Sequence, residues 1–277
     1  MNTLKKSVDE LKVIANDIRK EIVKMIHKAQ SGHPGGSLSC ADMIAALYFN
    51  KLNVDPKDPK SPDRDRFVLS KGHACPALFP ALWMLGFTDY DAMENFRHVQ
   101  STYSSTPSPK MPGVDMSSGP LGQGLSAAVG MALAGRVQKK DFNTYCLTGD
   151  GESQEGQMWE AMMAAAKYQL GRLVCIIDRN KIQMCGTTEE VMPLGDLDAK
   201  CASFGWEVHH IDGHNMQEIV DTLDALDLKD KGAPHMIIMD TIKGKGVSFM
   251  ENTAAWHGKA PSDEQFEQAM QELGGNV

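Results

Sequence analysis

Hydrophobic residues recur at helical spacing at the start of the chain and form short continuous runs further along. Over residues 8–29 they fall on one helical face. Short apolar runs predict buried strands at 67–69, 145–147, 174–177, 206–211 and 235–242. Helices are predicted between them at 74–85, 89–98, 124–138, 155–170, 197–204 and 216–227. This alternation predicts an α/β protein, doubly wound, with a mostly parallel sheet and helices on both faces.

The remaining segments lack a strand or helix period. A glycine-rich turn is predicted at 31–37, followed by a helix to Phe49 that Ser39 and Asp42 would open as a capping box. Residues 51–64 and 99–120 are rich in turn-forming residues, and a connection as long as the second is usually functional or disordered. We expect one domain over residues 1–277, with 261–277 as a mobile or partner-contacting tail.

Composition excludes several classes of protein. The apolar fraction of 42% is enough for a large core, and the formal charge of −8 without a basic stripe argues against nucleic acid as a partner. Residues 1–30 have no signal-peptide pattern, and no apolar run has membrane-spanning length. Six cysteines form no Cys-x-x-Cys pair, so reduced thiols in the cytoplasm are expected.

Asp150 and Asn180 are the strongest candidates for chemistry. Each closes an apolar run, at 145–147 and 174–177, and a helical stretch separates the two runs. Such a crossover joins parallel strands, which places both side chains at carboxyl ends of neighbouring strands, where open α/β sheets bind ligands. A carboxylate and an amide oxygen suit a hard divalent cation that also binds phosphate oxygens. The sequence therefore predicts a metal-bridged diphosphate site.

Gly149 and Gly151 flank the aspartate. We expect them to let the main chain turn sharply and approach a phosphate, with the N–H groups of the following helix directed at the anion. An ordinary β-turn followed by an unrelated asparagine is the alternative that this short motif leaves open by itself.

Gly149-Asp150-Gly151 followed by Asn180 resembles the thiamine diphosphate motif. Four further segments resemble transketolase: SGHPGGS at 31–37, RDRFVLSKGH at 64–73, GPLGQG at 119–124 and WHG at 256–258. The resemblance runs from about residue 10 to residue 260. It covers only the amino-terminal, diphosphate-binding part of the single-chain enzymes, as in the split form made of two polypeptides.

The resemblance implies a thiamine diphosphate-binding fold and a set of cofactor contacts. Mg²⁺ or Ca²⁺ would be held by Asp150, Asn180 and the main-chain carbonyl of Ile182. The cofactor contacts implied besides these are Gly149, Gly151, His73, His257 and the loop residues Gly119, Pro120 and Leu121.

Three histidines are the candidate catalytic residues, because imidazole titrates near neutral pH and the chemistry needs proton transfer. The resemblance implies that His33 acts at the substrate, His73 at the diphosphate or substrate, and His257 at both. A solvent-exposed loop histidine or a helix-cap residue is the ordinary alternative. His27, His209, His210, His214 and His235 are interpreted as structural, because their spacing suits no ordinary zinc site.

One position departs from the family pattern. Transketolases carry a histidine where this chain has Thr106, and in the family that histidine contacts the terminal hydroxyls of the donor sugar. Threonine cannot become cationic, so we expect an altered donor, such as a branched, deoxy or sulfonated ketose, unless a different loop register brings His98 into the site. Glu155 is expected at a subunit interface.

The activating glutamate of the family belongs to a part with no counterpart after residue 260. We therefore expect a second subunit carrying the pyrimidine-binding and carboxy-terminal domains, in an α2β2 assembly, with transfer of a glycolaldehyde unit from a ketose to an aldose, both sugars or sugar phosphates. The alternatives are the α chain of a 2-oxo acid dehydrogenase, a protein like 1-deoxyxylulose-5-phosphate synthase and a non-catalytic paralogue. A Rossmann dehydrogenase lacks its glycine fingerprint here.

Overall fold

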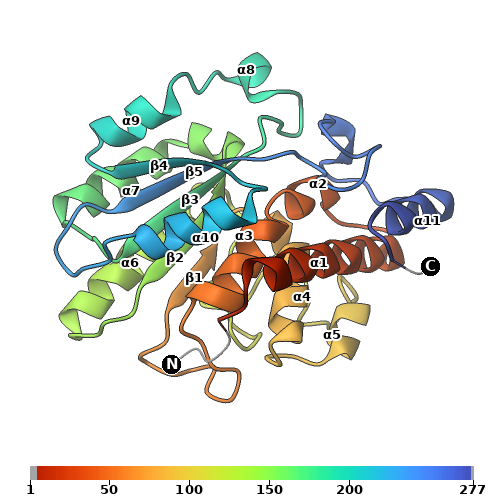
Figure 1. Cartoon of the computed structure of the whole chain (residues 1–277), viewed down its shortest axis with the longest axis horizontal. Coiled ribbons are helices and arrows are strands. Elements are labelled where there is room, and N and C mark those ends of the chain that lie inside the picture. The colour runs from red at the N-terminus through yellow and green to blue at the C-terminus, as the bar shows by residue number, and fades with distance from the viewer. Residues whose placement is uncertain (1–4, 276–277) are drawn as a thin grey trace.

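The computed structural model describes residues 5–275 and contains a five-stranded parallel sheet in the order β1-β2-β3-β5-β4 (Figure 1). The strands are β1 (Arg66–Leu69), β2 (Thr144–Gly149), β3 (Leu173–Arg179), β4 (Glu207–Asp212) and β5 (His235–Asp240). Every neighbouring pair is parallel. The predicted doubly wound α/β fold is therefore confirmed, with each predicted strand in place.

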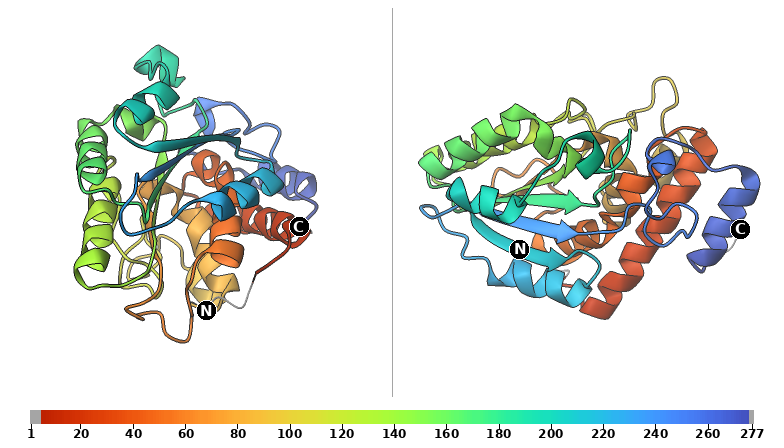
Figure 2. Two further views of the ribbon diagram at one scale, coloured as in Figure 1. Left: turned by 60° about the vertical axis from the view of Figure 1, so that its left-hand side comes forward. Right: turned by 90° about the horizontal axis from the view of Figure 1, so that it is seen from above.

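Helices cover both faces of the sheet, which is the central layer in the left view of Figure 2. One face carries α1 (Val8–Ala29), α3 (Ala41–Ala46), α4 (Cys75–Met84) and α10 (Met216–Ala225). The other carries α6 (Gly124–Val137), α7 (Gly156–Lys167) and α9 (Leu197–Ser203). The sequence predicted each of these except α3, which begins within the predicted 39–49 helix.

The strand β3 explains why the sheet is buried on both sides. Val174 and Ile176 pack in the cluster under α1 and α10, whereas Cys175 and Ile177 pack in the opposite cluster under α6 and α7. Side chains alternate along a strand, so a continuous apolar run serves two cores. At about 25 cal/mol per Å² of apolar surface, this double burial is what stabilises the central strands.

The segment 31–51 differs from its prediction. Residues expected as a turn form the short helix α2 (Pro34–Leu38), and the chain continues through α3 into a π-helical turn at Leu47–Lys51. The capping box is wrong, because Ser39 donates its hydroxyl to Asp178 and Asp42 pairs with Arg19. Both polar groups are buried, so tertiary partners replace the local bonds.

The carboxy-terminal segment is ordered as α11 (Asp263–Glu272), which lies beside α1 (Figure 1). Ser262 opens it with a capping box, Ala269 and Met270 are buried, and Phe266 stacks on His27 at 4.2 Å between ring centroids. A mobile tail is therefore wrong for these residues, and contact with a partner stays a prediction. Residues 276–277 lie outside the described residues.

Shorter elements complete the chain. They are α5 (Tyr90–Glu94), α8 (Thr188–Val191) and 3₁₀ turns at Gly72–Ala74, Gly151–Gln154 and Ala254–Trp256. Residues 99–120 contain no helix or strand, as predicted. Within residues 5–275, no helix combines the length and the apolar character that crossing a membrane requires.

Candidate active site

A cavity of about 250 Å³ opens at the carboxyl ends of β2, β3 and β5. Asp150 and Asn180 both line it, since Gly149 pairs in register with Asp178 on the neighbouring strand. The predicted meeting of these two side chains at adjoining strand ends is confirmed. The cavity is lined further by Gly36, Lys71, His73, Leu121, Gly149, Gly151, Glu152, Gln154, Glu155, Ile182, Gln183, Met184, Cys185, Lys243 and His257.

Asp150 is 3% exposed and faces the predicted cation position. Its two carboxylate oxygens accept the backbone N–H groups of Gly151 and Lys181 at 2.7 and 2.5 Å. Burial, together with the nearby Asp178 carboxylate, raises the pKa of Asp150 to about 6. A carboxyl group held in this way gains from a nearby cation, because the cation favours its charged form.

A lysine ammonium already lies beside the predicted metal-ligating carbonyl. Lys243 donates from Nζ to the carbonyl oxygen of Ile182 at 2.7 Å, while Asn180 accepts the Ile182 N–H at 3.2 Å. Burial lowers the pKa of Lys243 to about 8. Asp150 favours its charged form. The carbonyl, the amide oxygen and the carboxylate thus surround a position suited to positive charge.

An ion pair below the cavity fixes the strand ends. Lys71 and Asp178 are both almost fully buried and form a short salt bridge, and Lys71 also donates to the carbonyl of Gly36 at 2.8 Å. Asp178 accepts further hydrogen bonds from Ser39, Thr241 and Asn180. Although burial opposes charge, Lys71 and these donors hold the pKa of Asp178 below its usual value. Asn180 is therefore oriented by a fixed carboxylate.

Glu152 ties three loops together at the other wall. One carboxylate oxygen accepts from the Ser70 hydroxyl and from the Gly122 N–H at 2.8 Å, and the other accepts the Gly149 N–H at 3.0 Å. Burial raises the pKa of this carboxyl, against the effect of those hydrogen bonds. The loop before α6 and the turn after β2 are thereby held at a set separation.

The two glycines of the motif behave differently from the prediction. Neither has a positive φ, and their N–H groups bind Glu152 and Asp150 rather than facing outward. The expected anion site on these N–H groups is therefore wrong. Gly151 is nevertheless required at close quarters, because a Cβ there would lie 2.9 Å from the side-chain oxygen of Gln183.

The three candidate catalytic histidines meet at one place, although they come from three distant segments. Ring centroids are 5.2 Å apart for His33 and His73, 5.6 Å for His33 and His257, and 5.2 Å for His73 and His257. Burial is the main cause that lowers the pKa of all three, to about 4 for His257. All three are neutral at pH 7 in the absence of bound anions.

Two cations fix the proton position on two of these rings. The Arg97 guanidinium lies 3.2 Å from His33 Nδ1, and Lys243 Nζ lies 2.8 Å from His257 Nδ1. Both cations can only donate, so both Nδ1 atoms accept and each neutral ring carries its proton on Nε2. Two imidazole N–H donors of defined orientation result.

Other predicted residues lie around this centre. Leu121 and Glu155 line the cavity, whereas Gly119 and Pro120 do not; Gly119 instead lies against Thr106. Thr106 is half-buried and outside the cavity lining.

The alternative loop register is not found. His98 is exposed beside a separate hollow formed by residues of the 89–103 segment.

Sequence reasoning missed Lys71, Asp178, Lys243, Glu152 and Arg97 as site residues. Lys243 had a usable signal, since it follows β5 as Asp150 follows β2. Asp178 also had one, because an acid within an apolar strand must find a buried partner. The Arg97 contact depends on a chain path with positive φ that no local pattern indicates.

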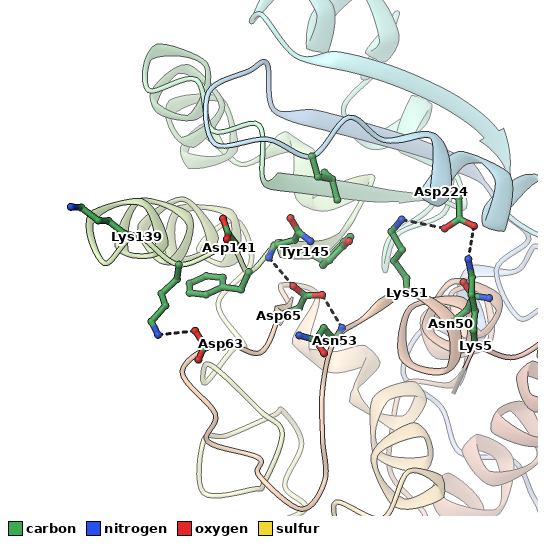
Figure 3. A pocket seen from close by; sticks show the side chains of 14 residues that line it. Lys5, Asn50, Lys51, Asn53, Asp63, Asp65, Lys139, Asp141, Tyr145 and Asp224 are labelled. Atoms are coloured by element: carbon green, nitrogen blue, oxygen red, sulfur yellow. Dashed lines mark hydrogen bonds and ion pairs between the residues drawn. The ribbon is translucent and has the colours of Figure 1, made fainter. Parts of the chain in front are cut away.

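A larger, open hollow of about 840 Å³ lies at the opposite, amino-terminal ends of β1 and β2 (Figure 3). Its charges satisfy one another: Lys5 and Lys51 both pair with Asp224, and Asp65 accepts two backbone N–H groups (Figure 3). No predicted site residue lines it. The smaller cavity is therefore the candidate active site.

Comparison with known proteins gives a consistent result. Residues 10–277 match the family model of the transketolase thiamine diphosphate-binding domain. One of the two subunits of an apulose-4-phosphate transketolase from Phocaeicola vulgatus is 44% identical over 266 residues, which are 96% of this chain and 94% of that protein. A 6-deoxy-6-sulfo-D-fructose transketolase subunit from Clostridium sp. is 44% identical over 260 residues, or 94% of each chain.

Single-chain transketolases match over less than half of their length. The human enzyme is 37% identical over 264 residues, which are 95% of this chain and 42% of that protein. The crystal structure of transketolase from Campylobacter jejuni superposes with a TM-score of 0.91 at 32% identity, covering 98% of this chain and 44% of the other.

Proposed function

Because this chain belongs to the transketolase family, as its thiamine diphosphate-binding domain, we propose that it is one subunit of a two-component transketolase. The complete enzyme would move a two-carbon glycolaldehyde unit from a ketose to an aldose. The observation that carries the proposal is a single cavity with cation-binding oxygens on one wall and imidazoles on the other.

The residues present fit thiamine diphosphate with a divalent cation. Asp150, Asn180 and the Ile182 carbonyl would hold Mg²⁺ or Ca²⁺, since all three offer oxygen atoms and Lys243 already donates to one of them. His73, His257 and Lys243 would face the diphosphate, whose negative charge raises the pKa of neighbouring imidazoles. When bound, the cofactor supplies the nucleophilic carbon and the electron sink for cleaving the bond beside a ketone.

The chain's own groups bind the substrate and move protons. His33 and His257 each present Nε2–H, so they would donate to the substrate carbonyl and hydroxyls. Proton transfer by a positioned imidazole typically contributes a factor of about 10² to 10⁴ in rate. Arg97 and Lys243 keep the two rings in the donating tautomer.

The donor sugar is proposed to be a modified ketose. Thr106 stands where the family has a histidine, and it packs against Gly119 at the edge of the site. Two relatives of nearly equal length are named for apulose 4-phosphate and 6-deoxy-6-sulfo-D-fructose. A threonine hydroxyl provides one neutral hydrogen bond, which suits a donor whose terminal groups differ from those of ordinary ketose phosphates.

A second subunit is proposed to close the cavity. Leu121 and Met184 line its rim with 39% and 66% exposure, and Glu155 is exposed beside them. Exposed apolar side chains around a polar cavity fit a protein interface. The partner would supply the pyrimidine-binding domain and the activating glutamate, in an α2β2 assembly that buries Glu155.

The test is reconstitution with the purified companion subunit, thiamine diphosphate and Mg²⁺. Donors to compare are xylulose 5-phosphate, fructose 6-phosphate, 6-deoxy-6-sulfo-D-fructose, apulose 4-phosphate and pyruvate, with an aldose acceptor. We expect ketol transfer from a modified ketose, and none when either polypeptide is assayed by itself. Turnover of pyruvate instead of any ketose, or full activity of this chain alone, would refute the proposal.

The donor assignment has its own control. In Thr106→His the preference should move toward ordinary ketose phosphates. Equal turnover of those sugars by the two proteins would show that Thr106 does not set the donor.

A further inference from the structure

Two histidines and a glutamate gather at the amino-terminal ends of β4 and β5, at the other end of the sheet from the active site. Glu207 and His209 are two residues apart on β4, so they share one face of the strand. His235 begins β5 and pairs in register with Glu207. All three side chains lie on the sheet face that carries α10, because Ile211 and Ile237 continue the same alternation into that core.

The potential ligand atoms lie close together. His209 Nε2 is 3.7 Å from one carboxylate oxygen of Glu207, and His235 Nδ1 is 3.8 Å from the other. One ligand atom from each residue falls within 4.8 Å of the other two. The rings are 5.8 Å apart between centroids and nearly parallel, with 28° between their planes.

The imidazoles lack the partners that buried polar groups normally have. His235 is 1% exposed, yet neither ring nitrogen has a hydrogen-bond partner, and neither does His209 Nε2. Leaving a buried polar group unpaired costs about 1–3 kcal/mol, so such atoms require an explanation. By contrast, the neighbouring His210 is bonded to Asp198 and Asp240 at 2.9 and 3.3 Å.

We propose that Glu207, His209 and His235 form a binding site for a divalent transition metal of the zinc class. Zinc–nitrogen and zinc–oxygen bonds of about 2.0–2.2 Å place tetrahedral ligands about 3.4 Å apart, so the observed separations need to close by only a few tenths of an ångström. Glu207, whose side chain is 52% exposed, can make that adjustment. Solvent would supply the fourth ligand.

The expectation that the histidine spacing suits no zinc site considered helices and loops only. On paired strands, residues i and i+2 meet a cross-strand neighbour on one face, and two of the three ligands here come from β4. A bound metal would tie the edge strand β4 to β5, which is a stabilising role. It is separate from the cation at Asp150, whose ligands are all oxygen atoms.

The test is titration of the full chain with Zn²⁺ by calorimetry, in excess Mg²⁺. His209→Asn and Glu207→Gln should weaken binding at least tenfold, and Zn²⁺ should raise the Tm of the wild type but not of these variants. His210→Asn is the matched control, an imidazole on the same strand, and should bind within about twofold of the wild type. Bound Co²⁺ should report imidazole ligands in its visible absorption.

Contrary outcomes are clear. The site is refuted if the wild-type chain takes up no Zn²⁺, or if His209→Asn and Glu207→Gln bind as tightly as the wild type. It is also refuted if binding is lost only in His257→Asn, because the metal would then lie among the active-site histidines. Glu207→Gln changes an exposed side chain, so it stays informative even if a histidine variant unfolds.

Discussion

Replacing Lys71 with methionine should destabilise the chain strongly, because it leaves the Asp178 carboxylate buried without its cation. The Lys71 and Asp178 side chains are 2% and 0% exposed. Removing one partner of a buried pair typically costs about 3–5 kcal/mol. Ser39, Thr241 and Asn180 still donate to the carboxylate, so we expect the lower end, about 3 kcal/mol.

For a domain of this size that loss lowers the Tm by about 6–12 °C. Differential scanning calorimetry and urea unfolding measure it. Lys140→Met is the matched control, because Lys140 pairs with Asp63 at the surface and should lose less than about 1 kcal/mol. The double variant Lys71→Met/Asp178→Asn should recover much of the loss, because no uncompensated charge remains.

The pH dependence follows from the direction of the shift. Asp178 has a depressed pKa, so its contribution is present above the unfolded-state value and is lost as pH falls through the lower folded-state value. The difference between wild type and Lys71→Met should therefore stay constant from about pH 8 to pH 5. A Lys71→Met chain within about 1 kcal/mol of wild type would refute the reasoning.

Three further predictions concern the site and its frame. The pKa of Asp150 is raised to about 6, so its carboxylate is lost as pH falls; Mg²⁺-dependent cofactor affinity should drop at least tenfold between about pH 7 and pH 5, and equal calorimetric affinities would contradict this. Gly122→Ala should lower the Tm and the cofactor affinity more than Gly86→Ala: both have positive φ, but only at Gly122 would a Cβ lie 2.7 Å from Glu155. Ser262→Ala should cost about 1 kcal/mol by removing the α11 cap, and an unchanged urea midpoint would count against it.

Local patterns predicted the frame of the molecule well. The helix at 8–29 matches α1 at both ends, and the unit from β2 through α7 to β3 has the predicted parallel pairing. These segments are determined by residue spacing, because an apolar stripe or run can be buried in only one way. Asp150 and Asn180 followed from that topology.

Long-range partners were beyond local reasoning. Ser39 and Asp42 have capping-box spacing, yet their side chains bind Asp178 and Arg19, from elements far away in the sequence. The helix α11 was missed because the residues that bury it belong to α1, although Ser262 and Gln265 carry a capping signal. Contacts of this kind depend on the whole fold.

The most direct test of the account is calorimetry of thiamine diphosphate binding to the reconstituted two-component assembly, with and without Mg²⁺. The account predicts saturable binding only with Mg²⁺, and loss of at least tenfold in affinity for Asp150→Asn and for Asn180→Ala. Asp58→Asn, on the exposed 51–64 loop, should bind like the wild type. Metal-independent binding, or undiminished affinity in the two site variants, would contradict the central claim.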